Sequence, residues 1–258
     1  MHHPMLNIGI RAAHAAGDLI VKYIDRIEGL DVNSKGRNDF VSEVDKQAEL
    51  IIIDHIHKAY PEHGILAEES GKQGNDTYQW IIDPLDGTTN FLHGFPQFAV
   101  SIALKHRNVL DQAVVYDPLR QELFTASKGA GAHLNNRRIR VSKQTDLEGA
   151  LIGTGFPYGN MDKLERYLDC FRQICPETAG IRRAGAASLD LAYVACGRLD
   201  GFWEFDLQEW DIAAGALLIR EAGGTVKDIG GDEDLKSGSI VAGNLKLEAC
   251  LSKVLNGQ

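Results

Sequence analysis

Two aspartates at the end of an apolar run are the residues in this sequence best placed to do chemistry. Trp80-Ile81-Ile82 has the composition of a buried strand, and Asp83-Pro84-Leu85-Asp86-Gly87-Thr88 follows it directly. Pro84 has a fixed φ and disfavours the helical conformation for Asp83, so the backbone places the first carboxylate. Hard oxygen ligands at a rigid strand end suit Mg²⁺, which usually shares its coordination shell with substrate phosphate. The segment therefore predicts a metal and phosphate site.

Taken alone, this motif has a second interpretation as a surface turn whose aspartates only cap the backbone. Two further acidic segments argue against that interpretation. Ile65-Leu66-Ala67-Glu68-Glu69 is another short apolar run that ends in carboxylates, and Glu209-Trp210-Asp211 opens a helix rich in alanine and leucine. Three such ends can converge on two cations about 3.5–4 Å apart, which stabilise the attacking and leaving oxygens. If a helix begins at Thr88, the amides of Gly87 and Thr88 can bind an anion as well.

Composition and charge narrow the function classes. The 258 residues, 44% hydrophobic and 24% charged, are typical of a soluble enzyme of one large or two small domains. No run approaches the ~18 apolar residues of a membrane span, and the N-terminus does not resemble a secretory signal. The four cysteines lack C-x-x-C spacing, so we expect reduced thiols and a cytoplasmic protein. The net charge of −9 argues against direct nucleic-acid binding and favours bound cations as the means of holding a phosphate.

Hydrophobic periodicity predicts the elements of the first half. We expect helices over 5–27 and 40–60, the second ended by Pro61 and Gly64. Strand patterns follow over 64–66, 79–82, 98–105, 112–116 and 122–126, with a hairpin from 131–134 to 139–141. Asn135-Asn136 is the expected turn of that hairpin.

The second half alternates strands with helices. The expected strands are 151–155, 180–183, 201–205, 225–228 and 239–242, and the expected helices are 161–174, 187–196, 211–221 and 244–255. Sheet layers between helix layers are the simplest packing of this pattern. We expect an N-terminal α+β half over 1–145 and a C-terminal α/β half over 146–258, joined in one compact unit.

These segments resemble the inositol monophosphatase family, the Mg²⁺-dependent and lithium-sensitive phosphatases. Its first signature is similar to Trp80 through His93, and its second to Trp210-Asp211-Ile212-Ala213-Ala214-Gly215 running to Gly224. The likeness extends over nearly the whole chain. It is strongest to the bacterial SuhB-like branch, through Tyr116-Asp117-Pro118 and Ser188-Leu189-Asp190-Leu191.

The resemblance implies a five-layer α-β-α-β-α sandwich and two to three Mg²⁺ ions. Glu68, Asp83 and the carbonyl of Leu85 would bind the first ion, and Asp83, Asp86 and Asp211 the second. A third, weaker ion would use Glu68. The first half would therefore carry most metal ligands, and the second half Asp211 and the sugar pocket.

The resemblance also assigns catalytic and substrate-binding roles. Asp45 and Thr88 would orient and deprotonate the attacking water, although Glu68 is an alternative proton acceptor. The residues expected to contact the substrate are Glu68, Leu85, Asp86, Gly87, Thr88, Arg182, Gly185, Ala187, Glu204 and Asp211. Lys35 lies in a basic loop that either closes over the metals or is simply solvated.

One strand end departs from the family pattern. Asp206 stands where glycine is usual, and Glu209 lies just before Trp210. We expect two additional acids beside the sugar pocket to affect which substrate is preferred, and not the phosphatase chemistry.

The expected function is hydrolysis of myo-inositol 1-phosphate and related polyol phosphates by a homodimer. Fructose 1,6-bisphosphate and 3′-phosphoadenosine 5′-phosphate are the rival substrates, because the metal core is common to the superfamily. The rival from another class is the SuhB-like role in antitermination of ribosomal RNA transcription. That role would use a protein partner, since the composition shows no nucleic-acid face.

Overall fold

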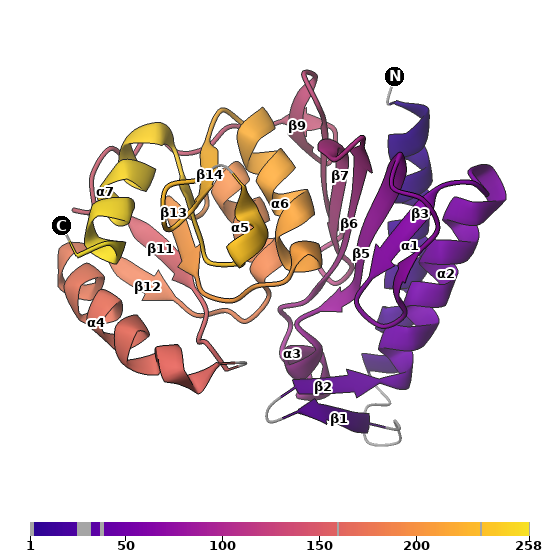
Figure 1. Cartoon of the computed structure of the whole chain (residues 1–258), viewed down its shortest axis with the longest axis horizontal. Helices are drawn as coiled ribbons and strands as arrows, with labels where there is room; N and C mark the ends of the chain where they lie inside the picture. The colour runs from indigo at the N-terminus through magenta and orange to yellow at the C-terminus, as the bar shows by residue number, and fades with distance from the viewer. Residues whose placement is uncertain (1–2, 25–31, 37–38, 159, 233, 258) are drawn as a thin grey trace.

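Two sheets and the helices that cover them make up the molecule (Figure 1). The computed structural model describes residues 3–24, 32–36, 39–158, 160–232 and 234–257, with the backbone alone for 32–36 and 39–42. The larger sheet is formed by residues 64–138 and the smaller one by residues 151–243. Each sheet therefore comes from one continuous stretch of chain, while a division into halves near residue 145 stays a prediction.

The first stretch builds an eight-stranded mixed sheet in the order β10-β9-β8-β7-β6-β5-β3-β4. Its strands are β3 (Gly64–Ala67), β4 (Gly71–Gln73), β5 (Tyr78–Asp86), β6 (Ala99–His106), β7 (Val109–Asp117), β8 (Glu122–Ser127), β9 (Gly131–Leu134) and β10 (Arg137–Arg138). The helices of this stretch are α1 (Pro4–Ile24), α2 (Glu43–Ala59) and the short α3 (Thr88–Leu92). A separate antiparallel pair joins β1 (Val32–Gly36) to β2 (Asp39–Ser42).

The second stretch builds a five-stranded sheet in the order β12-β11-β13-β15-β14. Its strands are β11 (Leu151–Thr154), β12 (Gly180–Arg182), β13 (Gly201–Glu204), β14 (Thr225–Asp228) and β15 (Ile240–Gly243). Its α-helices are α4 (Leu164–Ile174), α5 (Ala187–Ala195), α6 (Glu209–Glu221) and α7 (Leu245–Leu255). Short 3₁₀ turns lie at Met161–Lys163, Cys175–Glu177 and Leu235–Ser237.

Three hydrophobic cores hold five layers together, in the arrangement that the family resemblance implied. The core of the first two layers packs α1 and α2 against one face of the large sheet, around Trp80 and Ile102. The central core packs α5 and α6 between the two sheets, around Phe124 and Phe202. The third packs α4 and α7 on the outer face of the small sheet, around Trp203 and Tyr167. Figure 1 shows the resulting α-β-α-β-α order.

The structure corrects several expected boundaries. The helix predicted from Phe40 begins only at Glu43, because the preceding residues form β2 and pair with β1. β-branched and aromatic residues such as Phe40 and Val41 favour strands. The expected loop around Lys35 is therefore partly a strand, and the predicted end of the first helix at 25–27 lies outside the described residues.

The hairpin at Asn135-Asn136 is confirmed, since both residues have positive φ values of 46° and 64°, as a type I′ turn requires. The position predicted for its second strand, 139–141, is wrong, however, because the strand is β10 at Arg137–Arg138. That strand ends at Arg138, and Val141 instead donates its backbone N–H to the carbonyl of Ala222, 3.3 Å away at the end of α6. The chain leaves the large sheet here to reach the central helix layer.

Among the described residues, no helix has the length and apolar composition needed to cross a membrane.

Candidate metal and phosphate site

The end of β5 positions the two central aspartates. β5 runs through Pro84, and its pairing with β6 shifts register between Asp83 and Asp86, so a bulge replaces regular ladder bonds where proline lacks an N–H. Asp83 accepts a hydrogen bond from the N–H of Leu85 at 3.0 Å. Both aspartates are nearly buried, with 2% and 9% of their surfaces exposed. The backbone thus places both carboxylates, as the motif predicted.

The N-terminus of α5 holds Asp86 from the opposite half of the molecule. Ser188 lies in the first turn of α5 and donates its N–H and its hydroxyl to Asp86 Oδ2, at 2.7 and 2.5 Å. The amides of Ala187 and Leu189 contribute to the same carboxylate. One oxygen of Asp86 therefore accepts hydrogen bonds from α5, and these bonds connect the central helix layer to the large sheet.

Glu68 is brought beside Asp83 because β3 and β5 are parallel neighbours. Ala67 is paired with Ile82, and Glu68 continues the ladder by donating its N–H to the Ile82 carbonyl at 3.1 Å. The turn that follows is fixed by Glu49 of α2, whose carboxylate accepts the N–H groups of residues 69 and 70 at 2.8 and 2.9 Å. The parallel pairing places Glu68 and Asp83 at the same end of the sheet.

Asp211 reaches the same region from the first turn of α6. It is the third residue of the helix and accepts the N–H of Gln208 at 2.7 Å, in a capping box. The hydroxyl of Ser101 on β6 donates to the carbonyl of Trp210 at 3.3 Å, which ties this turn to the large sheet. The helix begins two residues earlier than predicted, at Glu209, because the cap lies at Gln208.

The electrostatics show that the four carboxylates share one site. The pKa of Asp83 is raised well above its ordinary value, first by burial and then by the charges of Glu68, Asp86 and Asp211. Burial and the charge of Asp86 raise the pKa of Asp211 in the same way. Burial also raises the pKa of Asp86, although the hydrogen bonds from Ser188 oppose the shift. Such a cluster repels itself until positive charge is added.

This donor set fits Mg²⁺. The charge of Glu68 is among the causes that raise the pKa of Asp83, so added positive charge would favour the ionised form of both groups. The fit is one of donor chemistry and not of geometry, because among the described residues no three Asp, Glu, His or Cys side chains are grouped closely enough to hold a metal ion. One oxygen of Asp86 and one of Asp211 accept hydrogen bonds from protein donors. Carboxylate and carbonyl oxygens with additional water or phosphate are the usual shell of Mg²⁺.

Thr88 and Asp45 lie at the side of this cluster. The Thr88 hydroxyl lies 2.7 Å from Asp45 Oδ1 and 3.0 Å from the carbonyl of Leu85. Asp45 is fully buried in the first turn of α2, not at a solvated mid-helix position. The periodicity of α2 alone gives no reason for a buried aspartate here, whereas its contact with Thr88 does.

Gly87 allows the chain to turn between the aspartates and α3. Its φ is 92°, and a Cβ at this position would lie 2.8 Å from the carbonyl oxygen of Gln97. The helix predicted to start at Thr88 does start there. The backbone of Gly185 approaches from the second half of the molecule, 3.3 Å from the same hypothetical Cβ, and Ala187 begins α5 nearby.

Asn90 joins these two loops. Its side-chain amide lies within hydrogen-bonding distance of the carbonyls of Gln97, Ala184 and Gly185, at 2.7, 2.9 and 3.2 Å. The loop that carries Gly185 is thereby held against the loop that carries Gly87. The expected substrate-binding residues at 87, 88, 185 and 187 are therefore brought together.

Glu204 ends β13 and faces the acidic cluster. Burial raises its pKa to about 8, the charges of Asp190 and Asp86 add to the shift, and Arg183 opposes it. A Cβ on Gly155 would lie 1.9 Å from Glu204 Oε1, so the carboxylate rests directly on the Gly155 backbone. Glu204 is therefore a half-buried residue near the metal site and not a solvated strand residue.

The two arginines of this region differ in placement. Both residues are exposed, and Arg182 donates to the carbonyl of Ile181 at 3.1 Å. Arg183 stacks on the rings of Phe156 and Tyr158, about 5 Å from each centroid, and its charge acts on Glu204. The substrate role of Arg182 stays a prediction, and Arg183 lies closer to the expected pocket.

The two additional acids are both paired with lysines. Asp206 has a φ of 62°, which explains why glycine suits this position, and its carboxylate pairs with Lys163. Glu209 pairs with Lys105 of β6. Their charges are therefore partly neutralised, and their effect on the preferred substrate stays a prediction. The side chain of Lys35 lies outside the described part of the chain.

A five-layer sandwich with carboxylates gathered between its two sheets is typical of the metal-dependent phosphatase class. The chain belongs to the inositol monophosphatase family, whose model matches residues 1–257. The protein named "Nus factor SuhB" of Pseudomonas aeruginosa is 59% identical over 251 residues, which are 94% of this chain and 92% of that protein. The "Nus factor SuhB" of Escherichia coli K12 is 53% identical over 245 residues, with the same coverage.

Solved structures agree with this assignment. The extragenic suppressor protein suhB of Bartonella henselae superposes with a TM-score of 0.95 at 46% identity, over 98% of both chains. Inositol monophosphatase of Anabaena (Nostoc) sp. PCC 7120 has a TM-score of 0.85 at 39% identity, over 98% of this chain and 95% of the other. The fold expected from the sequence is therefore confirmed.

Sequence reasoning missed four residues that shape the site: Ser188, Glu49, Asn90 and Asp190. Ser188 carried a usable signal, since serine in the first turn of a predicted helix often serves as a local hydrogen-bond donor. Asn90 lies within the motif from Trp80 to His93, but the local sequence did not indicate which carbonyls its side chain would contact. Asp190 is 2% exposed on α5, and burial and the charge of Asp86 raise its pKa. Only the packing of the two halves reveals its neighbours.

Proposed function

We propose that the protein is a Mg²⁺-dependent phosphomonoesterase that hydrolyses myo-inositol 1-phosphate and related polyol phosphates. The observation that carries the proposal is the meeting of Glu68, Asp83, Asp86 and Asp211, four mutually repelling carboxylates, beside the Thr88–Asp45 hydrogen bond. Membership of the inositol monophosphatase family supports the same reaction class. A cytoplasmic homodimer is part of the proposal.

Glu68, Asp83 and the Leu85 carbonyl would hold one ion, and Asp83, Asp86 and Asp211 a second. When bound, Mg²⁺ lowers the pKa of coordinated water and neutralises charge on the phosphate and the leaving oxygen. Asp83 can serve both ions because each of its oxygens has its own lone pairs.

The protein groups orient the water and the phosphate. Asp45 accepts a hydrogen bond from the Thr88 hydroxyl, which leaves the threonine oxygen lone pairs directed at the attacking water. The proton passes to the Asp45–Thr88 pair or to Glu68. The amides of Gly87 and Thr88 bind phosphate oxygens. Catalysis in this scheme is positioning plus electrostatic stabilisation, without a covalent intermediate.

The sugar pocket would be formed by Glu204 together with the loop at Gly185 and Ala187. The Glu204 carboxylate lies near Asp86, and bound cations would favour its ionised form, in which it accepts hydrogen bonds from ring hydroxyls. Small residues at 185 and 187 let a ring approach the backbone closely.

A side-by-side hydrolysis assay tests this proposal. Phosphate release is measured from myo-inositol 1-phosphate, fructose 1,6-bisphosphate and 3′-phosphoadenosine 5′-phosphate at equal concentration and saturating Mg²⁺. We expect the highest kcat/KM with myo-inositol 1-phosphate. A higher kcat/KM with either rival would overturn the substrate assignment, and no release from any of them would overturn the phosphatase.

A second candidate function rests on the names of the relatives. Two proteins at 53–59% identity are named Nus factors, which suggests a role with a protein partner in transcription. A strain carrying Asp83→Asn separates the two functions. If deletion of the gene impairs growth, but the Asp83→Asn strain grows normally without phosphatase activity, then the binding role is the function under selection.

A further inference from the structure

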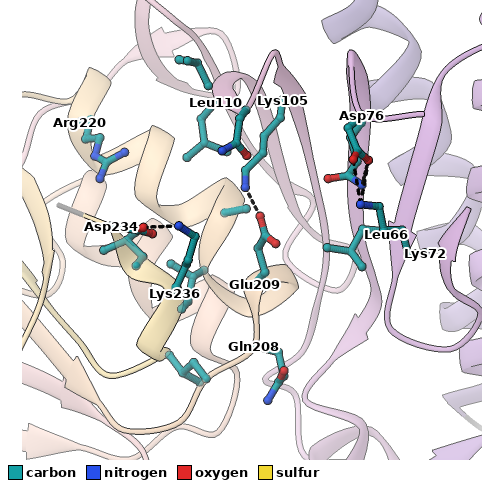
Figure 2. Close-up of a pocket in the computed structure, with 17 residues that line it drawn as sticks. Leu66, Lys72, Asp76, Lys105, Leu110, Gln208, Glu209, Arg220, Asp234 and Lys236 are labelled. Atoms are coloured by element: carbon teal, nitrogen blue, oxygen red, sulfur yellow. Dashed lines mark hydrogen bonds and ion pairs between the residues drawn. The ribbon is translucent and has the colours of Figure 1, made fainter. Parts of the chain in front are cut away.

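A second cavity lies between the two halves, apart from the acidic cluster (Figure 2). Its volume is about 910 Å³, which lies within the range of small-molecule sites. One wall is the face of α6 that carries Glu209, Ile212 and Arg220. The opposite wall is the part of the large sheet that α6 leaves uncovered, with Leu66 of β3 and Lys105 of β6.

The strands separate this cavity from the metal site. It is bounded by Gln79, at the start of β5, whereas Asp83 and Asp86 lie at the end of that strand. On α6 the cavity extends along the helix as far as Arg220, about two and a half turns beyond Asp211. None of the four clustered carboxylates lines it.

Positive charge from four separate elements faces this cavity: Lys72 of β4, Lys105 of β6, Arg220 of α6 and Lys236 before β15. Each lysine has a carboxylate partner, and these pairs are Lys72–Asp76, Lys105–Glu209 and Lys236–Asp234. The lining therefore carries four cations against three carboxylates, in a chain whose formal net charge is −9.

Arg220 supplies the uncompensated charge. Among the described residues its guanidinium has one hydrogen-bond partner, the carbonyl of Val226, at 3.4 Å. Figure 2 shows Arg220 and Lys236 on the same side of the cavity, with Asp234 joined to Lys236, while Lys105 extends from the sheet to Glu209. Exposed ion pairs such as Lys236–Asp234 contribute little to stability, so an incoming anion can replace their carboxylates at small cost.

An apolar surface lies beside these charges. Leu66 and Leu110 of the sheet line the cavity together with Ile212 and Leu235. A ligand that joins an anionic group to a flat or apolar body would use both parts of the lining, since guanidinium groups bind phosphate through paired N–H donors and apolar walls bury the body.

We infer that this cavity binds a small phosphate monoester with a ring-shaped body, its phosphate at Arg220 and Lys236 and its ring on the leucine surface. The inference rests on the cavity alone and does not depend on the proposed catalytic function.

Isothermal titration calorimetry on metal-free protein in EDTA tests the inference. Without cations the acidic cluster repels anions, so binding reports this cavity only. The probes are adenosine monophosphate, phenyl phosphate, inorganic phosphate and adenosine. We expect at least one of the two esters to bind with a Kd below 1 mM, and at least tenfold more tightly than inorganic phosphate or adenosine.

Two variants locate the site. Arg220→Gln and Lys236→Gln should each weaken ester binding by at least fivefold, and the exposed Lys236 has little part in folding. Lys253→Gln on α7, an exposed lysine far from the cavity, is the matched control and should bind like wild type. Absence of ester binding, equal binding of inorganic phosphate, or unchanged affinity in both cavity variants would overturn the inference. Active phosphatase without ester binding in EDTA would leave the proposed function intact and this inference refuted.

Discussion

The Thr88 hydroxyl lies 2.7 Å from Asp45 Oδ1, although the two residues are 43 positions apart and belong to different helices. Asp45 is fully buried at the start of α2, and Thr88 is the first residue of α3, directly after the aspartate motif. The contact joins the helix layer outside the large sheet to the end of β5. It gives a buried carboxylate a partner and places a hydroxyl at the edge of the acidic cluster.

Thr88→Val should lower kcat by roughly 10²–10⁴-fold, the usual contribution of a positioned proton-transfer group. Valine keeps the shape of the side chain but cannot donate to Asp45 or orient water. Steady-state kinetics measure the effect, and Mg²⁺ affinity from calorimetry should change less than threefold. Thr88→Ser, which keeps the hydroxyl, is the control and should retain most of the activity. Near-normal kcat in Thr88→Val would remove this pair from the mechanism.

Asp83→Asn should abolish turnover and stabilise the metal-free protein. The substitution removes one charge from a buried, self-repelling cluster, and we expect about 1 kcal/mol or more of added stability, which corresponds to a rise in Tm of about 2–4 °C. Thermal unfolding in EDTA measures the gain. Asp169→Asn, at an exposed aspartate of α4 paired with Arg172, is the matched control and should not raise Tm. More than a tenth of wild-type activity in saturating Mg²⁺ would contradict the bridging role.

Stability of the metal-free protein should fall as pH rises from about 4.5 to about 8. Folding raises the pKa of Glu204 from 4.5 to about 8, and those of Asp83 and Asp211 well above 3.8. Between the unfolded and folded pKa values the folded state holds more protons, so the free energy of unfolding decreases with pH. Saturating Mg²⁺ should reduce this decrease, because cations replace the protons.

Thermal melts in EDTA at pH 5, 6, 7 and 8 measure this dependence. His63 has a pKa lowered by burial and acts in the opposite direction near neutral pH. The difference between wild type and Glu204→Gln isolates the carboxylate contribution, and the variant should lose less stability over this interval. A wild-type profile no steeper than that of Glu204→Gln would be inconsistent with the prediction.

Glu204→Gln should also weaken discrimination among sugar phosphates. A carboxylate that accepts hydrogen bonds from ring hydroxyls contributes roughly 1.5–3 kcal/mol, or about 10–150-fold in kcat/KM for myo-inositol 1-phosphate. Hydrolysis of an aryl phosphate, which has no hydroxyls at that position, should hardly change. Equal losses on both substrates would instead make Glu204 part of the metal or water machinery.

The sequence predicted the strands and helices whose positions are determined by local residue patterns. The Pro84 motif predicted the end of β5, and the two apolar runs before it identified the strands that bring Glu68 to Asp83. The five layers followed from the order of strands and helices, together with the family resemblance. The positions of β1, β2 and β4 were not predicted, because short strands have little periodicity to detect.

Contacts between the halves could not be predicted from sequence. Ser188 donates to Asp86 across 102 positions, and Asn90 reaches Gly185 across 95. Lys105 of the large sheet partly neutralises Glu209, which the local sequence presented as an unpaired charge. Each of these contacts depends on how the two sheets pack on the central helices, and no local pattern encodes that arrangement.

Phosphate release from myo-inositol 1-phosphate as a function of Mg²⁺ concentration tests the central claim most directly, with wild type and Asp83→Asn compared in parallel. The account predicts no release in EDTA, a steep rise with Mg²⁺ for wild type and a flat response for Asp83→Asn. Full wild-type activity in EDTA, or an Asp83→Asn curve that follows wild type, would contradict a Mg²⁺-dependent phosphatase at this acidic cluster.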